Sequence, residues 1–157
     1  MTARLLILNG PNINLLGERE PEIYGSTTLA EVEAGCRAFA AELGVEVRFQ
    51  QSNHEGVIVD HIQDARKTAD AIIINPAGLS FHSIPVFDSL KVFSGPIIEV
   101  HVSNIHARDE LHRHSIMSRA ATTVICGAGP YGYILAMQAA ARMLGVVGND
   151  LPGPIRG

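Results

Sequence analysis

The sequence predicts an α/β fold with a doubly wound, five-stranded parallel sheet and helices on both of its faces. Short apolar runs, rich in β-branched residues, alternate along the chain with segments whose apolar residues recur every three or four positions. Such runs are typical of parallel strands that are covered on both faces. The 157 residues, of which 46% are hydrophobic and 18% charged, suffice for one domain with a sizeable core.

The expected strands and helices follow one another in order. Strands are expected at residues 3–9, 45–51, 70–75, 96–102 and 122–126. Helices are expected at residues 28–44, 55–69, 84–93 and 133–145. The first helix opens with Thr28 and Glu31 in the register of a capping box, and Gly44 ends it. Five strands in this length favour a flavodoxin-like arrangement in one domain, residues 1–157, with an irregular tail at about 148–157.

Polar side chains follow nearly every predicted strand. The first strand leads to Asn12, the third ends at Asn75, and the fourth carries Glu99, His101 and Ser103. In doubly wound folds, ligands bind beyond the carboxyl ends of the strands, which meet at one edge of the sheet. A fold without a ligand has no need of amides and imidazoles at almost every strand exit. We therefore expect a small-molecule site at this edge.

Charge and composition exclude several classes of partner. The formal net charge is −4 and the sequence has no run of Lys and Arg, which argues against nucleic acid and against an anionic membrane. No apolar segment has the length of a membrane span, and no signal-peptide pattern is present, so a cytoplasmic protein is expected. Cys36 and Cys126 lack metal-binding spacing and are interpreted as reduced core residues.

The motif GAGPYG (residues 127–132) matches G-x-G-x-x-G between a strand and a helix, a pattern that can indicate a dinucleotide-binding site. That fingerprint requires a full β-α-β unit and a ribose-binding carboxylate, whereas Asp150 lies in no recognisable strand. We interpret the motif as a tight turn.

The stretch HARDELHRHS (residues 106–115) contains three histidines and two acidic residues, a composition that can indicate a metal-binding site. No two of these histidines are four residues apart, and the spacing matches no zinc pattern, so no metal is expected. A polar loop in which Arg108 or Arg113 binds an anion is the preferred interpretation.

The stretch EVHVSN (residues 99–104) points to acid–base chemistry. On a strand, Glu99 and His101 face the same side, so the carboxylate can orient the imidazole. The alternative is a histidine that only has its hydrogen bonds satisfied at the end of a strand. Ser103, on the same side, adds a hydroxyl.

The segment at about 17–26 supplies a second candidate group, the phenol of Tyr24. A tyrosinate held between the guanidiniums of Arg19 and Arg108 would be a competent general base. The glycines and prolines of this segment suit a lid that closes over a ligand. The alternative is a surface loop with an incidental tyrosine.

Five stretches together resemble the type II 3-dehydroquinate dehydratases, from about residue 4 to about residue 140: LNGPNINLLGEREPEIYGSTTL, QSNHEGVIVDHI, INPAG, IEVHVSNIHARDE and GAGPYGYILA. The resemblance implies a flavodoxin-like fold and a homo-oligomer, a dodecamer built as a tetramer of trimers. It implies removal of water from the small-molecule substrate 3-dehydroquinate to give 3-dehydroshikimate, without metal or organic cofactor. The reaction would serve either aromatic amino acid biosynthesis (the shikimate pathway) or quinate catabolism.

The resemblance also implies roles for single residues. Tyr24, whose ionisation Arg108 and Arg19 would favour, abstracts a proton from the carbon beside the ketone. Asn12 holds a water that stabilises the resulting enolate.

The resemblance further implies that His101, oriented by Glu99, protonates the departing hydroxyl. The residues implied to hold the substrate carboxylate are Asn75, Val102 and Ser103. Asp88 would reach the site of a neighbouring subunit.

Two positions depart from the family pattern. Phe81 stands where the family has a substrate-binding histidine, and His112 where it has a substrate-binding arginine. The expected residue types occur one position downstream, as His82 and Arg113.

Three hypotheses remain. In the first, His82, His112 or Arg113 restores the missing contacts in an ordinary dehydratase. In the second, the same chemistry acts on a differently hydroxylated cyclic substrate, since loss of a buried polar partner can change discrimination by orders of magnitude. In the third, the chain is a weakly active paralogue with a binding or regulatory role.

Overall fold

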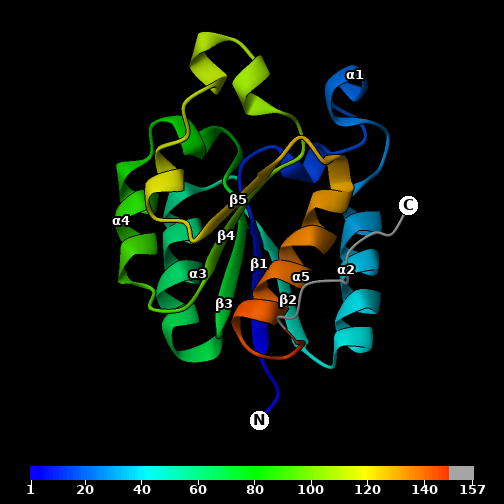
Figure 1. Cartoon of the computed structure of the whole chain (residues 1–157). Helices are drawn as coiled ribbons and strands as arrows, with labels where there is room; N and C mark the ends of the chain where they lie inside the picture. The colour runs from blue at the N-terminus through cyan, green and yellow to red at the C-terminus, as the bar shows by residue number, and fades with distance from the viewer. Residues whose placement is uncertain (149–157) are drawn as a thin grey trace, which may run out of the picture.

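The computed structural model describes residues 1–148 and confirms the doubly wound α/β fold. Five parallel strands form one sheet in the order β2-β1-β3-β4-β5, the flavodoxin-like order (Figure 1). The strands are β1 (Arg4–Asn9), β2 (Glu46–Gln51), β3 (Ala71–Asn75), β4 (Ile97–His101) and β5 (Thr123–Cys126). The irregular tail expected at about 148–157 lies almost wholly outside the described residues.

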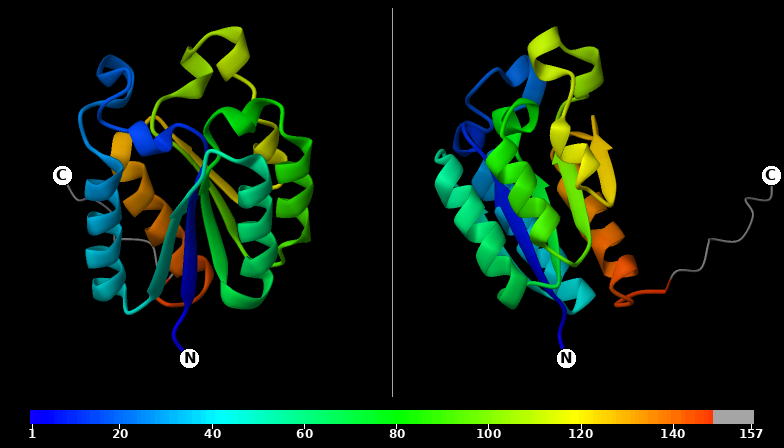
Figure 2. Two further views of the ribbon diagram at one scale, coloured as in Figure 1. Left: turned by 180° about the vertical axis from the view of Figure 1, so that it is seen from behind. Right: turned by 90° about the vertical axis from the view of Figure 1, so that its left-hand side faces the viewer.

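Two long helices cover each face of the sheet. The four are α2 (Leu29–Leu43), α3 (Glu55–Thr68), α4 (Ile84–Val92) and α5 (Gly132–Met143). Helices α2 and α5 pack on one face and α3 and α4 on the other, as Figures 1 and 2 show. The predicted strands and long helices thus agree with the structure to within two residues at each end. Thr28 caps α2 by accepting a hydrogen bond from the Glu31 N–H at 3.2 Å, and Gly44 follows its end.

The alternation of side chains along β1 explains why its apolar run is continuous. Leu5 and Ile7 join the core beneath α2 and α5, whereas Leu6 and Leu8 join the core beneath α3 and α4. All four side chains are buried. Because both faces are covered, a β1 strand with a polar alternate face would be destabilised.

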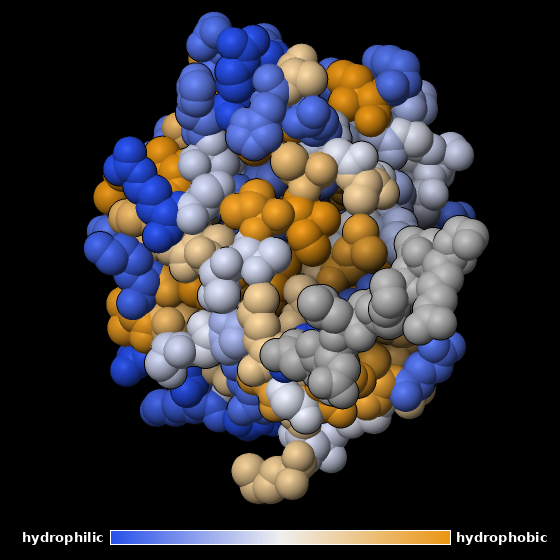
Figure 3. Space-filling model, in the orientation of Figure 1, coloured by the Kyte–Doolittle hydropathy of each residue, from blue (hydrophilic) through white to orange (hydrophobic). Residues whose placement is uncertain are grey.

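Short helices gather at the carboxyl end of the sheet, where the sequence predicted only loops. They are α1 (Pro21–Tyr24) and the 3-10 helices η1 (Ile13–Leu15), η2 (Ala77–Phe81), η3 (Ile105–Ala107), η4 (Glu110–His112) and η6 (Gly129–Tyr131), whereas η5 (Ile116–Arg119) packs beside α4. Helix α1 and the segment of η3 and η4 stand above the strand ends (Figure 1). Hydrophilic residues cover the end of the molecule that carries this segment (Figure 3).

A close backbone approach joins two of the strand exits. The Gly10 N–H donates to the carbonyl of Asn75 at 2.8 Å, and a Cβ on Gly10 would overlap the carbonyl oxygen of Pro76. Only glycine lets the segment after β1 lie this close to the segment after β3. Within residues 1–148, no helix combines the length and the apolar character that a membrane span needs.

Candidate active site

A cavity lies beyond the carboxyl ends of the strands, at the edge where the sequence predicts a site. Its lining combines polar and apolar side chains from the segments that follow β1, β3 and β4. The residues of the sequence prediction that line it are Asn12, Arg19, Tyr24, Asn75, His101, Val102, Ser103, Arg108 and His112. Residues from chain positions as far apart as 12 and 112 therefore meet in one cavity.

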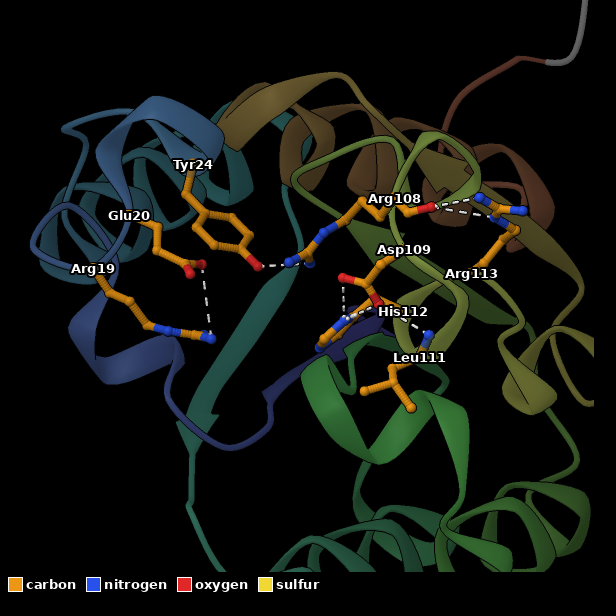
Figure 4. A network of polar contacts seen from close by, with 8 residues as sticks. All are labelled: Arg19, Glu20, Tyr24, Arg108, Asp109, Leu111, His112 and Arg113. Carbon is orange, nitrogen blue, oxygen red and sulfur yellow. Dashed lines mark hydrogen bonds and ion pairs between the residues drawn. The ribbon is translucent and has the colours of Figure 1, made fainter.

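Four predicted residues do not line the cavity. Glu99 is fully buried beneath His101. His82 places its Nδ1 3.2 Å from the Gly78 carbonyl oxygen. Asp88 is exposed on α4. Arg113 donates to the Arg108 carbonyl oxygen at 2.8 and 3.2 Å and to Glu110, and its side chain turns away from the cavity (Figure 4). Of the three residues that the first hypothesis names, His112 lines the cavity and His82 and Arg113 do not.

Glu99 and His101 form a buried pair on β4. Their i, i+2 spacing puts both side chains on one side of the strand, and His101 Nε2 hydrogen-bonds Glu99 Oε2. The Ser118 hydroxyl donates to Glu99 Oε1 at 2.7 Å. Burial disfavours the charged carboxylate, but the hydrogen bonds outweigh it and hold the pKa of Glu99 below its ordinary value. The predicted orientation of the imidazole by the carboxylate is therefore present in the structure.

Tyr24 meets two arginines from different segments. Arg108 Nη1 donates to the Tyr24 hydroxyl oxygen at 2.8 Å, across 84 residues of sequence. The guanidinium carbons of Arg108 and Arg19 lie 5.6 and 5.8 Å from the centre of the Tyr24 ring. Arg19 also pairs with Glu20 at 3.8 Å (Figure 4). A guanidinium at hydrogen-bonding distance stabilises negative charge that develops on the oxygen atom it contacts.

The two positions that depart from the family pattern contact each other in the cavity. The rings of Phe81 and His112 meet edge to face, with centroids 5.4 Å apart and an interplanar angle of 81°. His112 Nδ1 lies 2.9 Å from Asp109 Oδ1, and this hydrogen bond holds the pKa of Asp109 below its ordinary value. The sequence marked both positions but gave no sign that they touch.

Apolar residues of the cavity were missed by the sequence interpretation. They are Ile13, Leu15, Leu16, Ala77 and Ile105. Nothing in the sequence separates such residues from core residues, because an aliphatic side chain packs equally well against protein or ligand.

Amides after β2 support the site rather than line it. The Asn53 side-chain oxygen accepts from the Asn12 N–H at 2.9 Å and from Gln51 Nε2 at 3.1 Å. Asn12 and Ala77, which both line the cavity, have the positive φ angles 69° and 52°, unusual for residues other than glycine. Such strained positions persist where surrounding contacts fix them, and they cluster at functional sites.

The GAGPYG turn holds the end of β4. Gly127 and Gly129 have φ angles of 88° and 65°, and their N–H groups donate to the carbonyls of His101 and Val102 at 3.2 and 3.0 Å. The turn thereby fixes the backbone at two residues that line the cavity. Among residues 1–148, no three His, Cys, Asp or Glu side chains come close enough to hold a metal ion.

Comparison with known proteins gives one family. The model of the family described as dehydroquinase class II matches residues 3–141. A catabolic 3-dehydroquinase of Verticillium alfalfae is 53% identical over 142 residues, covering 90% of this chain and 95% of the relative. A 3-dehydroquinate dehydratase of Cereibacter sphaeroides is also 53% identical, over 88% of this chain and 94% of the relative.

Solved structures agree with the sequence relatives. The type II dehydroquinase from Butyrivibrio crossotus superposes with a TM-score of 0.87 at 36% identity, over 88% of this chain and 97% of that one. A 3-dehydroquinate dehydratase-like protein from Bifidobacterium longum gives a TM-score of 0.68 at 28% identity, over 92% and 99% of the two chains.

Proposed function

The chain belongs to the class II dehydroquinase family and is a carbon–oxygen lyase, and we propose that it removes water from 3-dehydroquinate to give 3-dehydroshikimate. The observation that carries the proposal is the meeting of two acid–base groups in one cavity. Tyr24, bound by Arg108, and His101, bound by Glu99, both line it. An elimination needs such a pair, because one group removes a proton while the other protonates the departing hydroxyl.

In the proposed mechanism, Tyr24 removes the proton from the carbon beside the ketone and an enolate forms. Arg108, 2.8 Å from the phenol oxygen, stabilises the negative charge of the base. Asn12 holds a water that donates to the enolate oxygen, as donors do in an oxyanion hole. The bonds balance: Tyr24 takes the proton and the C–H electrons form the double bond of the enolate. The C–O electrons then leave with the hydroxyl, which takes a proton from His101 as the enone forms.

His101 gives its proton to the departing hydroxyl, which leaves as water. Glu99 lies against Nε2 of this imidazole and fixes the orientation of the ring. Asn75, Ser103 and the main-chain amide of Val102 hold the substrate carboxylate on the sheet side of the cavity.

The test is turnover of 3-dehydroquinate by the purified chain, followed through the ultraviolet absorbance of the conjugated enone product. We expect Tyr24→Phe to reduce turnover by at least a thousandfold, because it removes the base. Tyr131→Phe is the matched control, since Tyr131 is 59% exposed and does not line the cavity. Full activity of Tyr24→Phe, or no turnover by the parent chain, would refute the proposal.

The contact of Phe81 with His112 favours a second candidate, a lyase for a related ring that carries fewer hydroxyls on this side. The pair presents an aromatic edge where a hydroxylated ring needs polar partners, while the acid–base groups are unchanged. If this is right, the parent chain turns 3-dehydroquinate over poorly, and Phe81→His combined with His112→Arg increases kcat/KM by one to two orders of magnitude. Normal turnover by the parent would exclude it.

We also infer that the chain works as a homo-oligomer in which Asp88 serves a neighbouring copy. Asp88 is exposed on α4 and lies outside the cavity of its own chain. Ile84 and Val92, one helical turn to either side of it, are 57% and 58% exposed, so one stripe of α4 combines apolar area with a carboxylate. Light scattering at several protein concentrations gives the molecular mass, and a monomer at all of them would exclude this inference.

A further inference from the structure

The first turn of α5, directly after the GAGPYG motif, contains a buried tyrosine, Tyr133, that has no part in the proposed acid–base chemistry. Tyr133 is fully buried, and the only polar atom of its side chain lies inside the core between α5 and the sheet. Its hydroxyl nevertheless has two partners, donating to Asn9 Oδ1 at 2.6 Å and accepting from Asn75 Nδ2 at 2.9 Å. Asn75 lines the cavity, so the Tyr133 hydroxyl is linked to the cavity lining through a single hydrogen bond.

The direction of these hydrogen bonds is fixed from one end by the main chain. Asn9 Nδ2 donates to the Gln50 carbonyl oxygen at 3.2 Å, and a carbonyl can only accept. Asn9 must therefore turn its oxygen towards Tyr133. The Tyr133 proton is then committed to Asn9, and only the lone pairs of the hydroxyl remain for Asn75.

The other end demands the same direction. The N–H of Ala77, which can only donate, lies 3.2 Å from Asn75 Oδ1. The amide oxygen of Asn75 thus faces Ala77 and its nitrogen faces Tyr133. Burial raises the pKa of Tyr133, so its hydroxyl stays protonated and can donate its hydrogen bond to Asn9. Two independent main-chain groups, of Gln50 and Ala77, leave one orientation for the Asn75 amide.

We propose that Tyr133 is a positioning residue that locks the Asn75 amide in one orientation, so that the free N–H of Asn75 Nδ2 donates to an acceptor group of the substrate. The identity of the substrate rests on the proposed function, whereas the lock does not. A phenylalanine at this position would fill the same space but leave the nitrogen of Asn75 without its acceptor. Only the 3.2 Å hydrogen bond from the Ala77 N–H would then oppose rotation of the amide, and the rotated amide presents its oxygen, which repels a carboxylate.

A double-mutant cycle in steady-state kinetics tests the proposal. We expect Tyr133→Phe to raise KM for 3-dehydroquinate about tenfold and to change kcat less than threefold, because a contact that only binds the substrate affects KM. Asn75→Ala should have a KM effect at least as large. In the Asn75→Ala background, Tyr133→Phe should change KM less than twofold. Multiplicative effects of the two changes would overturn the proposal, because they would show that Tyr133 acts only through the core.

Tyr131→Phe, two residues away and exposed, is the control for the cycle, and urea denaturation of each variant checks that it is folded. Should Tyr133→Phe not fold, the parent chain still decides the matter. In 15N-labelled protein, the two Nδ2 protons of Asn75 are assigned by their absence in Asn75→Asp, and the proton bonded to Tyr133 should exchange with solvent more slowly than the one that faces the cavity. Rapid exchange of both protons would overturn the lock. If the parent does not turn over 3-dehydroquinate, the proposed function fails alone, and this exchange measurement still tests the lock.

Discussion

Replacing Glu99 by Gln tests the buried pair on β4 with the least change in shape. Glu99 is fully buried and has two partners, Ser118 at 2.7 Å and His101. A hydrogen bond to a charged group contributes about 1.5–3 kcal/mol, against about 0.5–1.5 kcal/mol for a neutral one. The lowered pKa of Glu99 shows that its partners outweigh the cost of burying its charge. We therefore expect Glu99→Gln to lower the free energy of unfolding at neutral pH by about 1–2 kcal/mol.

The pH dependence of this difference follows from the direction of the pKa shift. Because the pKa of Glu99 is lower in the folded chain, its stabilisation is fully present above the unfolded value of about 4.3. It is lost as the pH falls through the lower, folded value. The stability difference between the parent and Glu99→Gln should therefore narrow below about pH 4.

Urea denaturation of both proteins at neutral and at acidic pH, with unchanged m-values, measures this difference. In the same variant, kcat should fall about tenfold, because a neutral amide at position 99 holds the His101 imidazole less firmly than the carboxylate does. Ser118→Ala is a partial control, because it removes one neutral donor and leaves the charge of Glu99 in place. Equal stability of parent and Glu99→Gln at neutral pH, or a difference that does not change with pH, would refute the reasoning.

Three further predictions concern the cavity and its supports. Arg108→Met removes the 2.8 Å hydrogen bond to Tyr24 and should lower kcat by about one to two orders of magnitude, read from steady-state kinetics; an unchanged kcat would contradict this. Gly10→Ala places a Cβ against the Pro76 carbonyl oxygen, so the free energy of unfolding, measured by urea denaturation, should fall by about 2 kcal/mol or more. Unchanged stability would show that the segments after β1 and β3 can move apart. Asp88→Asn should keep the stability of the single chain but lower activity, and wild-type activity would exclude a role for Asp88 at a neighbouring site.

The fold could be predicted from sequence because its signals are local. Strands β3, β4 and β5 are runs of β-branched residues and β1 is a leucine-rich run. Each long helix has three- and four-residue apolar spacing, and α2 begins and ends at the recognisable residues Thr28 and Gly44. The short helices above the sheet were not predicted. Segments of three or four residues such as α1 have too few hydrogen bonds to be stable alone, so contacts distant in sequence decide whether they form.

The site could be predicted as a set of residues but not as a set of contacts. The rule that ligands bind beyond the strand ends brought Asn12, Asn75 and His101 together correctly. It could not tell which polar residues point into the cavity, and Arg113 turns away to bind the carbonyl of Arg108. A direction of this kind depends on the path of an irregular segment, for which sequence periodicity gives no information.

The cavity has two walls that are held in different ways, and this difference limits how its specificity can change. On the sheet side, Asn75 and His101 are fixed from behind by buried partners, Tyr133 and Glu99. A substitution there disturbs the core as well as the ligand contact.

On the opposite side, the aromatic and charged side chains come from short helices and segments nearer the surface, where a contact such as that of Arg108 with Tyr24 is only partly buried. The ring contact between Phe81 and His112 is of this kind. Replacement of these two residues leaves the buried pairs untouched. We therefore expect it to change the substrate preference while the acid–base groups are retained. The double change Phe81→His with His112→Arg should accordingly alter kcat/KM far more than the free energy of unfolding, which we expect to stay within about 1 kcal/mol of the parent. A loss of stability as large as that of Glu99→Gln would show that the two walls are not independent.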